Sequence, residues 1–404
     1  MTLDPSPKNL YSLGVALLFC GIGITCIGLG IILFLNRTGQ IDRMSWESRW
    51  EGQPGTDYRH IPPEWIAYQQ TAVFQCPVPS PPTCFMVQND STYIIGTADP
   101  PALLFFDDKG TLLKKMDLPE EPRAVACGTS DTILTDKIVV VHPKRIAVYT
   151  AEGNQEGSWL IPWNDANITW REQLPEQPMF HSKGNIEGEN FGLEFNARCL
   201  VLTPNHLFVA ESRARRVYRF DAEGNHDRTF GESKGAPPGT QFSWMENKNY
   251  FGGFVVYASP IMMTYSPQAD LLYITNPGKH RVEAFTLDGL YQPELSWGET
   301  SASLSGFAGC CNPTWLETLD DGRILTVEKS VSRIKIYRTD GQLDCVVAGA
   351  NSLNDQLPES RRMPLQLDQR YFGVAVLSEG RIAIFDFGFS LIRIFSLRLL
   401  PDEK

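Results

Sequence analysis

Residues 197–232 read ARCLVLTPNHLFVAESRARRVYRFDAEGNHDRTFGE and contain the clearest copy of a repeated unit. It contains an apolar strand, a turn, a second strand that ends at Glu211, and a third strand of the pattern Arg-Val-x-x-Phe. An Asp-x-x-Gly turn and a weaker fourth strand complete the unit. The same order recurs in residues 260–299 and 312–349, which indicates a chain built from a repeated four-strand unit.

Fainter copies lie at residues 83–117 and 122–162, and a last, shorter copy lies at 372–397. Six units of four short strands with glycine-bearing turns predict an all-β fold, a six-bladed β-propeller. The last copy ends after its third strand. The segment YQQTAVFQC at residues 68–76 precedes the first unit and is predicted to supply the missing fourth strand. That pairing would close the ring and cover an open sheet edge.

Two of the units resemble NHL repeats. The resemblance is carried by NHLFVAESRARRVYRFDAEG at residues 205–224 and by LLYITNPGKHRVEAFTLDG at residues 271–289. A run that includes FAGCCNPTW at residues 307–315 is similar to bacterial, mostly extracytoplasmic NHL-type proteins with a Gly-Cys-Cys-Asn-Pro element. The resemblance covers residues 68–400 and implies an NHL-like six-bladed propeller. It implies no particular activity, because one fold serves many functions.

The N-terminal region carries the clearest signal outside the repeats. From Leu10 to Leu35 the chain has 26 residues without a charge, and about 20 apolar residues suffice to cross the hydrocarbon layer. This pattern predicts an uncleaved signal-anchor helix, with a cleaved signal peptide as the alternative. The expected domains are a short tail (1–9), a transmembrane helix (10–36), a stalk (37–66) and the propeller (67–401).

The charges on the two sides of this span barely decide its orientation. The short N-terminal tail and the lack of a second apolar span favour a propeller outside the cytoplasm, on the periplasmic side of a bacterial inner membrane. Small residues recur every seven positions at Gly14, Gly21 and Gly28. Such spacing lets another helix approach closely, so a protein partner in the membrane is expected.

The charge balance bears on the class of partner. The formal net charge is −11, and residues 45–404 carry −12 because residues 1–44 carry +1. An acidic propeller without a long run of Lys or Arg makes nucleic acid an unfavourable partner. No Gly-x-Ser-x-Gly, phosphate-loop or His-Glu-x-x-His motif occurs in the sequence. These observations favour a protein that is not an enzyme, but they do not decide the question.

The residues that close the predicted second strands are all polar. In a four-stranded blade, the turn after the second strand shares one face with the blade-to-blade loops, so we expect these residues to ring the central channel as a ligand- or partner-binding site. They are Asp99, His142, Glu211, Asn276, Glu328 and Asp386. The alternative is that these side chains cap turns and bond neighbouring backbone.

Some of these residues are also candidate metal ligands. Glu211, Asn276 and Asp386 offer oxygen atoms of the kind that calcium prefers. His142 and His280 fall on the same face by the repeat alignment, and with His181 they are a conceivable zinc centre. A divalent metal is therefore a candidate cofactor, and none is firmly implied.

Three blade-to-blade loops on this face are long. They span residues 163–192, 233–258 and 350–368. Long loops in a compact domain are usually functional or disordered, and the aromatic residues of the first two argue against plain disorder. We therefore expect Trp170, Trp244 and Tyr250 to contribute to ligand or partner binding. The alternative is that they only plug the channel mouth.

The adjacent pair Cys310 and Cys311 has three interpretations. The two thiolates could bind a soft metal, although a closed zinc site needs four ligands and no Cys-x-x-Cys accompanies them. They could form a vicinal disulfide that locks a turn and is easily reduced. They could also be ordinary buried thiols. The sequence leaves all three open.

The preferred hypothesis is a membrane-anchored, extracytoplasmic propeller that acts as a scaffold or sensor and binds a ligand or protein on its long-loop face. The alternative is an enzyme, either a metal-dependent hydrolase or lyase that works at the channel mouth, or a thiol-redox protein that uses Cys310 and Cys311.

Overall fold

A computed structural model describes residues 60–162, 197–212, 215–231, 254, 256, 259–309, 311–354 and 371–398. All of them belong to one compact unit, Asp57–Lys404. The other unit, Met1–Thr56, lies outside the described residues, so the predicted transmembrane helix and most of the stalk remain predictions. No helix within the described ranges is both long enough and apolar enough to cross a membrane.

The described strands form six antiparallel sheets of four strands, which we number as blades one to six. Blade one has β2 (Pro82–Gln88), β3 (Thr92–Ala98), β4 (Pro101–Phe106) and β5 (Leu112–Asp117), and blade two has β6 (Ala124–Cys127), β7 (Lys137–Val141), β8 (Arg145–Thr150) and β9 (Gln155–Leu160). Blade three has β10 (Ala197–Leu202), β11 (Leu207–Glu211), β12 (Arg216–Phe220) and β13 (His226–Phe230), and blade four has β14 (Met263–Ser266), β15 (Leu271–Asn276), β16 (Arg281–Thr286) and β17 (Tyr291–Trp297). Blade five has β18 (Trp315–Thr318), β19 (Ile324–Glu328), β20 (Arg333–Tyr337) and β21 (Leu343–Ala348), and blade six has β22 (Phe372–Val376), β23 (Ile382–Asp386), β24 (Leu391–Leu397) and β1 (Tyr68–Gln75).

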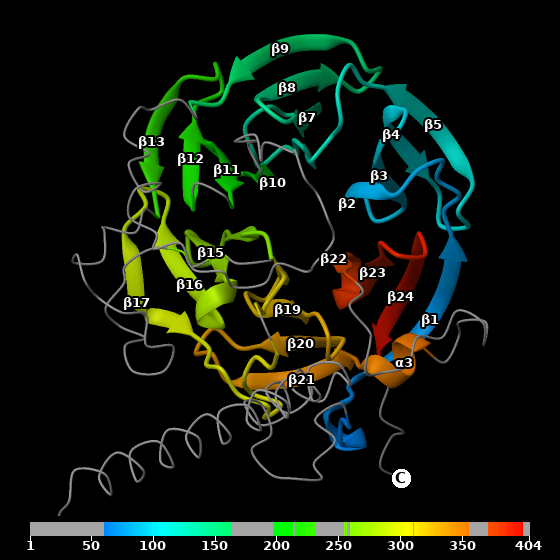
Figure 1. Cartoon of the computed structure of the whole chain (residues 1–404), viewed down its shortest axis with the longest axis vertical. Coiled ribbons are helices and arrows are strands. Elements are labelled where there is room, and N and C mark those ends of the chain that lie inside the picture. The colour runs from blue at the N-terminus through cyan, green and yellow to red at the C-terminus, as the bar shows by residue number, and fades with distance from the viewer. Residues whose placement is uncertain are drawn as a thin grey trace, which may run out of the picture. The chain divides into compact units, whose positions relative to one another are not determined.

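The sheets are arranged in a ring (Figure 1). The first strand of each blade contacts the first strand of the next, in the order β2, β6, β10, β14, β18, β22 and back to β2. These six strands therefore surround the central axis, and the fourth strands lie at the periphery. The prediction of a six-bladed β-propeller is confirmed, and each predicted unit coincides with one blade.

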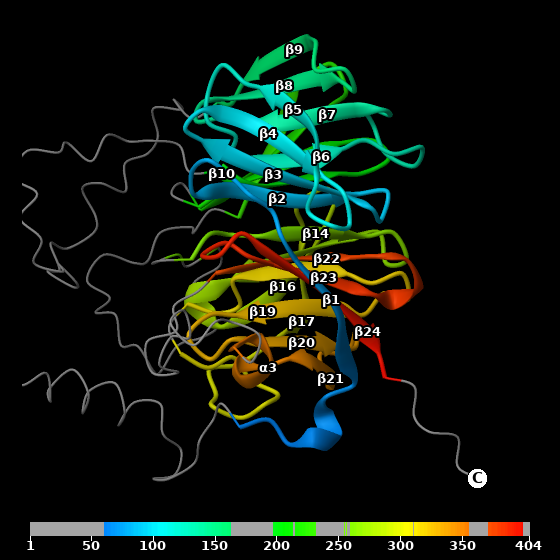
Figure 2. The same ribbon diagram turned by 90° about the vertical axis from the view of Figure 1, so that its right-hand side faces the viewer.

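The ring is closed by strands from the two ends of the propeller. β1 pairs antiparallel with β24, from Tyr68 opposite Leu397 to Gln75 opposite Leu391. Both views show the two strands side by side (Figures 1 and 2). The edge of β24 would otherwise expose unpaired backbone groups, so the predicted closure by residues 68–76 is confirmed.

The core lies between neighbouring blades. The middle strands are covered on both faces, and all five residues of β11 and of β19 are buried. This packing explains the nearly continuous apolar runs in the sequence, since a strand covered on both faces does not alternate between polar and apolar residues. The peripheral strand β5 is mostly exposed and carries polar residues.

The Asp-x-x-Gly signature marks the turn between the third and fourth strands. Asp221 accepts the backbone N–H groups of Glu223 and Asn225 through Oδ1, at 3.0 and 2.8 Å. Gly224 has a φ of +84°, and a Cβ atom there would come within 2.2 Å of the Trp159 ring. The turn therefore needs an acceptor at its first position and glycine at its fourth. Three short 3-10 helices, η1 (Pro63–Trp65), η3 (Pro277–Lys279) and η6 (Ser378–Gly380), and the short helix α3 (Ala350–Asn354) also lie within the described residues.

Candidate functional site

The antiparallel strands give the propeller two different faces. The loops that lead into the first strands share one face with the turns between second and third strands, and we call it the loop face. The turns after the first and third strands lie on the opposite face, which we call the hairpin face. A residue that opens a first strand therefore lies near the loop face.

A cavity of about 1380 Å³ lies on the axis of the ring. Its walls include residues from the first strand of every blade, for example Thr83, Val125, Leu200, Met263, Glu317 and Val374. It is therefore the central channel of the propeller. Ligand pockets typically have volumes of about 300 to 1,000 Å³, so the channel has room for a small molecule.

Charged residues are segregated along the channel wall. Arg123 directly precedes β6, Arg198 is the second residue of β10, and Arg215 lies in the turn between β11 and β12, so all three line the channel near the loop face. Two acidic lining residues, Asp90 and Asp320, lie in turns of the hairpin face. The described lining thus has a positive mouth at one end and carboxylates at the other.

The positive charges of Arg123 and Arg198 at the mouth interact with each other. Arg123 is 8% exposed, and its Nη2 lies 4.0 Å from Oε2 of Glu121. The pKa of Arg198 lies below its ordinary value, first because of burial and next because of the positive charge of Arg123, with Glu121 opposing the shift. The two arginines therefore line neighbouring parts of the wall, and the charge of one affects the pKa of the other.

The opposite side of the mouth is aromatic. Trp315 opens β18, Tyr371 directly precedes β22, and Phe387 lies in the turn between β23 and β24, and all three line the channel. The ring centroids of Trp315 and Phe387 are 6.1 Å apart. Blades two and three, which carry the arginines, lie across the ring from blades five and six. The mouth therefore has one cationic side and one aromatic side.

Glu317 places a carboxyl group on the channel wall in β18. Burial raises the pKa of Glu317 to about 7, and hydrogen bonds from Trp315 Nε1 and Thr264 Oγ1 act in the opposite direction. Both hydrogen bonds are long, at 3.4 and 3.5 Å. At pH 7 this carboxyl is close to half protonated and can donate as well as accept a hydrogen bond.

Three cysteines that were not predicted from the sequence also line the channel. They are Cys84, Cys127 and Cys199. Burial is the leading cause that raises the pKa of each thiol to about 12. Cys199 accepts the Met263 N–H at 3.1 Å and donates to the Met263 carbonyl. A protonated thiol is a poor nucleophile, so these cysteines act as wall residues.

The six residues that close the second strands do not line the channel. The first strand of each blade lies between them and the axis, and their expected place around the channel mouth stays a prediction. Asp99 is exposed in the turn after β3. His142 is buried, with its ring bonded to the Glu121 carbonyl and the Tyr149 hydroxyl at 3.2 and 3.3 Å. Burial lowers the pKa of His142, which keeps the ring neutral.

The strand register explains why these positions are polar. Glu211 lies opposite Arg216 and Glu328 lies opposite Arg333. Asn276 likewise lies opposite Arg281. In these three blades the third strand begins with the arginine that faces the closing residue of the second strand, and the opposite charges of the two Glu–Arg pairs are stabilising. A binding role for these residues remains a prediction.

The metal candidates are distributed over the ring. Glu211, Asn276 and Asp386 end β11, β15 and β23, which belong to three different blades. Asp386 accepts the Gly388 N–H at 3.0 Å and lies 3.7 Å from Arg393 Nη1. Within the described ranges, no group of three or more His, Cys, Asp and Glu side chains is placed to hold a metal ion.

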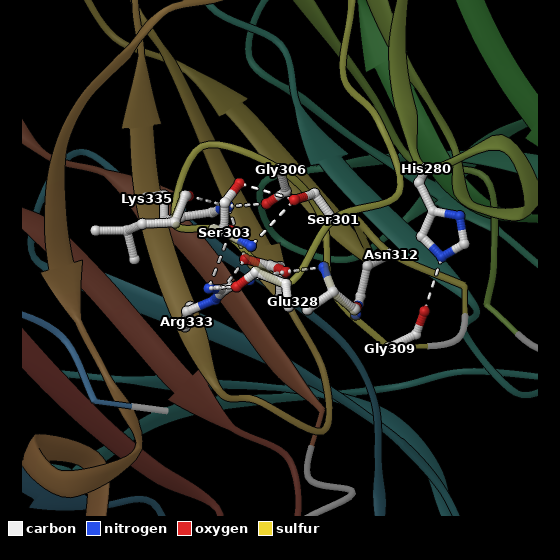
Figure 3. A network of polar contacts seen from close by, with 12 residues as sticks. His280, Ser301, Ser303, Gly306, Gly309, Asn312, Glu328, Arg333 and Lys335 are labelled. Atoms are coloured by element: carbon white, nitrogen blue, oxygen red, sulfur yellow. Dashed lines mark hydrogen bonds and ion pairs between the residues drawn. The ribbon is translucent and has the colours of Figure 1, made fainter. Parts of the chain in front are cut away.

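Glu328 belongs to a buried ion cluster in blade five, shown in Figure 3. Its carboxylate lies 2.8 Å from Arg333 Nη2 and 2.7 Å from Lys335 Nζ, and all three side chains are at most 1% exposed. It also accepts the Ala308 N–H at 2.7 Å. Burial alone would raise the pKa of Glu328, but the charges of Arg333 and Lys335 hold it below its ordinary value.

The loop before blade five covers this cluster (Figure 3). Lys335 Nζ donates to the carbonyls of Leu304 and Gly306 at 3.0 and 2.7 Å. It also lies 4.8 Å from the ring centroid of Phe307 and 5.0 Å from that of Tyr337. Carbonyl oxygens and aromatic faces therefore compensate the second positive charge of the cluster.

The Gly-Cys-Cys-Asn-Pro element continues from this loop. Asn312 accepts the Lys329 N–H at 2.9 Å and donates to the carbonyls of Lys329 and Ala308. His280 contacts the Gly309 carbonyl through Nε2 at 2.8 Å. Cys311 is buried at a φ of +62°, and its carbonyl accepts the Ser259 hydroxyl at 2.7 Å. The element thus ties blades four and five together.

Several sequence predictions fall outside the described residues. Cys310 is one of them, so the three interpretations of the cysteine pair remain predictions. Trp170, Trp244 and Tyr250 are others, together with His181 and most of the three long loops. The described parts of those loops are Phe254, Val256 and helix α3.

Four channel residues were not predicted from the sequence: Arg123, Arg198, Arg215 and Glu317. A signal was present in two first strands. Arg198 stands between Ala197 and Cys199, and Glu317 follows Leu316, so each is a charged residue inside an apolar strand. Once the first strand is known to line the axis, a charge in it points to the channel.

No family model matches the sequence, and no curated relative matches it. Among solved structures, the chain is similar to a protein of unknown function from Bacteroides thetaiotaomicron, with a TM-score of 0.50 and 12% identity over 82% of this chain and 72% of that chain. It is also similar to virginiamycin B lyase from Staphylococcus aureus, with a TM-score of 0.48 and 10% identity over 82% of this chain and all of that one. At these identities the likeness shows the fold alone, and the resemblance to NHL repeats remains a prediction.

Proposed function

We propose that this protein is a binding module that takes a ligand through the loop-face mouth of its central channel. The observation that carries the proposal is the built mouth, with Arg123 and Arg198 on one side and Trp315, Tyr371 and Phe387 on the other. A few charged groups set beside aromatic and aliphatic side chains are the usual composition of a small-molecule site.

We further propose that residues 10–36 anchor the propeller in the membrane, with the propeller on the periplasmic side of a bacterial inner membrane. The uncharged run from Leu10 to Leu35 supports the anchor. A sensor or scaffold of this kind would report the occupied channel to a membrane partner that contacts the glycine face of the helix. The enzymatic alternative is a metal-dependent hydrolase or lyase at the channel mouth, or a thiol-redox enzyme that uses Cys310 and Cys311.

The test is a thermal-shift screen of the purified full-length protein against a panel of small anionic, cationic and neutral molecules. The blocking variant is Ala375→Phe, which adds a ring to the channel wall in β22. The matched control is Ala151→Phe, an exposed position in the turn between β8 and β9. A binding protein stabilises on ligand addition, so at least one class should raise the melting temperature of the wild type and of Ala151→Phe.

The Ala375→Phe variant should lose this response while keeping the melting temperature that it has without ligand. A response that persists in Ala375→Phe would place the binding site outside the channel. A wild type that no member of the panel stabilises would contradict the proposed function.

A further inference from the structure

We infer that the loop-face mouth is an anion-binding site in which Arg123 and Arg198 hold the carboxylate or phosphate group of a small amphipathic ligand. The inference rests on the proposed function and names the chemical class of its ligand. It is carried by the placement of the two guanidinium groups in one cavity wall and by the distribution of the other lining residues.

The first step is the position of the two arginines. They stand at the loop-face ends of neighbouring first strands, because β6 and β10 are in contact. Both residues line the same cavity, and Arg123 is only 8% exposed. A guanidinium group offers a planar set of donors that matches the oxygens of a carboxylate or phosphate. Two such groups on adjacent strands can approach one anion from two directions.

The second step is the electrostatic cost of this arrangement. Burial and the charge of Arg123 both lower the pKa of Arg198, so the folded protein holds two like charges near each other where water is scarce. Glu121 partly offsets these charges, since its Oε2 lies 4.0 Å from Arg123 Nη2 and its charge raises the pKa of Arg198. An anion bound between the two guanidinium groups would interact favourably with both, and its binding would relieve their mutual repulsion.

The third step concerns the rest of the ligand. The wall across from the arginines carries Trp315, Tyr371 and Phe387, which suits an apolar or aromatic body. Asp90 and Asp320 line the hairpin-face end and would repel a second negative charge. The channel therefore fits a molecule with its negative charge at one end and an uncharged remainder, and it disfavours a polyanion threaded along the axis.

The experiment measures binding to the full-length protein by calorimetry. The probes are 3-phenylpropionate, its uncharged amide, and inorganic phosphate. The test variant is Arg123→Gln/Arg198→Gln. The matched control is Arg338→Gln, which removes an exposed arginine from the turn after β20 on the hairpin face. Soluble dihexanoyl phosphatidylglycerol forms a further arm, because a lipid headgroup carries the same phosphate chemistry.

The wild type and Arg338→Gln should bind 3-phenylpropionate with equal affinity and at least about tenfold more tightly than the amide, since charged hydrogen bonds are stronger than neutral ones. The double variant should lose that preference. Stronger binding of the lipid than of phosphate would identify a headgroup as the source of the anion. If the double variant does not fold, the single variant Arg198→Gln replaces it, and Arg198→Lys is the control that keeps the charge. The preference for 3-phenylpropionate over the amide is then compared between these two variants.

Equal binding of 3-phenylpropionate by the wild type and the double variant would overturn the inference, and so would a failure of the wild type to bind any anionic probe. These results are separable from a failure of the proposed function. If the amide or a cationic panel member binds the wild type and Ala375→Phe abolishes that binding, the channel is a binding site whose ligand is not an anion.

Discussion

The channel mouth and the ion cluster of blade five both bury arginine, yet they differ in what surrounds it. In the cluster, Arg333 and Lys335 share the carboxylate of Glu328 at 2.8 and 2.7 Å. The covering loop adds carbonyl oxygens and aromatic rings from the same chain. At the mouth, Arg123 and Arg198 line a cavity large enough for a small molecule.

The comparison shows that buried charge alone does not mark a binding site. Glu328 was a candidate because a charged residue ends an apolar strand, but its interactions are made within the protein. Arg123 and Arg198 combine charge with a cavity, because both side chains line the central channel. Charge that faces a cavity is therefore the more informative observation.

The largest effect should come from breaking the cluster. In Glu328→Gln, Arg333 and Lys335 lose their shared carboxylate while remaining at most 1% exposed. Removing one partner of a buried ion pair typically costs about 3 to 5 kcal/mol. Urea unfolding of the full-length protein should show a loss of that size. Arg333→Gln should show a similar loss, because it leaves the Glu328 carboxylate with fewer donors.

The control for the cluster is an exposed ion pair. Lys115 and Asp117 lie 2.7 Å apart with side chains that are 43% and 76% exposed. Asp117→Asn should leave the free energy of unfolding nearly unchanged, since exposed pairs contribute little. If Glu328→Gln were equally mild, the cluster would not be a structural element, and the contrast with the mouth would fail.

The fold was predictable from the sequence because its determinants are local and repeated. The second strands read as apolar runs, the Asp-x-x-Gly turns recur, and the incomplete last unit pointed to residues 68–76 as the closing strand. The residues that line the channel were not predictable, because their identity depends on which strand of each blade faces the axis. Arg123 lies just before its strand and Arg215 lies in a turn, so no periodicity singles them out.

The second prediction concerns Glu317 and the pH dependence of stability. Burial raises the pKa of Glu317 from 4.5 to about 7. Between these values the folded protein keeps a proton that the unfolded chain has released. The contribution of Glu317 to stability is therefore greatest below the unfolded pKa and falls as the pH rises toward 7. Glu317→Gln removes this dependence.

The free energy of unfolding of Glu317→Gln, relative to wild type, should accordingly rise by about 3 kcal/mol between pH 4.5 and pH 7, at 1.36 kcal/mol per unit of pKa. Urea titrations at several pH values measure the difference directly. A difference that stays constant across this range would show that the channel wall does not perturb the carboxyl, and that the interior of the channel is as well solvated as the surface.

The smallest change in the free energy of unfolding is expected for a substitution at the channel mouth. This small change would distinguish the mouth from the ion cluster of blade five. Arg198→Gln removes one of two neighbouring positive charges, so relief of repulsion offsets the lost packing of the side chain. The free energy of unfolding should change by less than about 1 kcal/mol, as for substitutions outside buried networks. Added 3-phenylpropionate should stabilise the wild type in proportion to RT ln(1 + [L]/Kd) and stabilise Arg198→Gln less. A loss as large as that of Arg333→Gln would instead place Arg198 in an ion cluster that holds the fold together, as Glu328, Arg333 and Lys335 do in blade five.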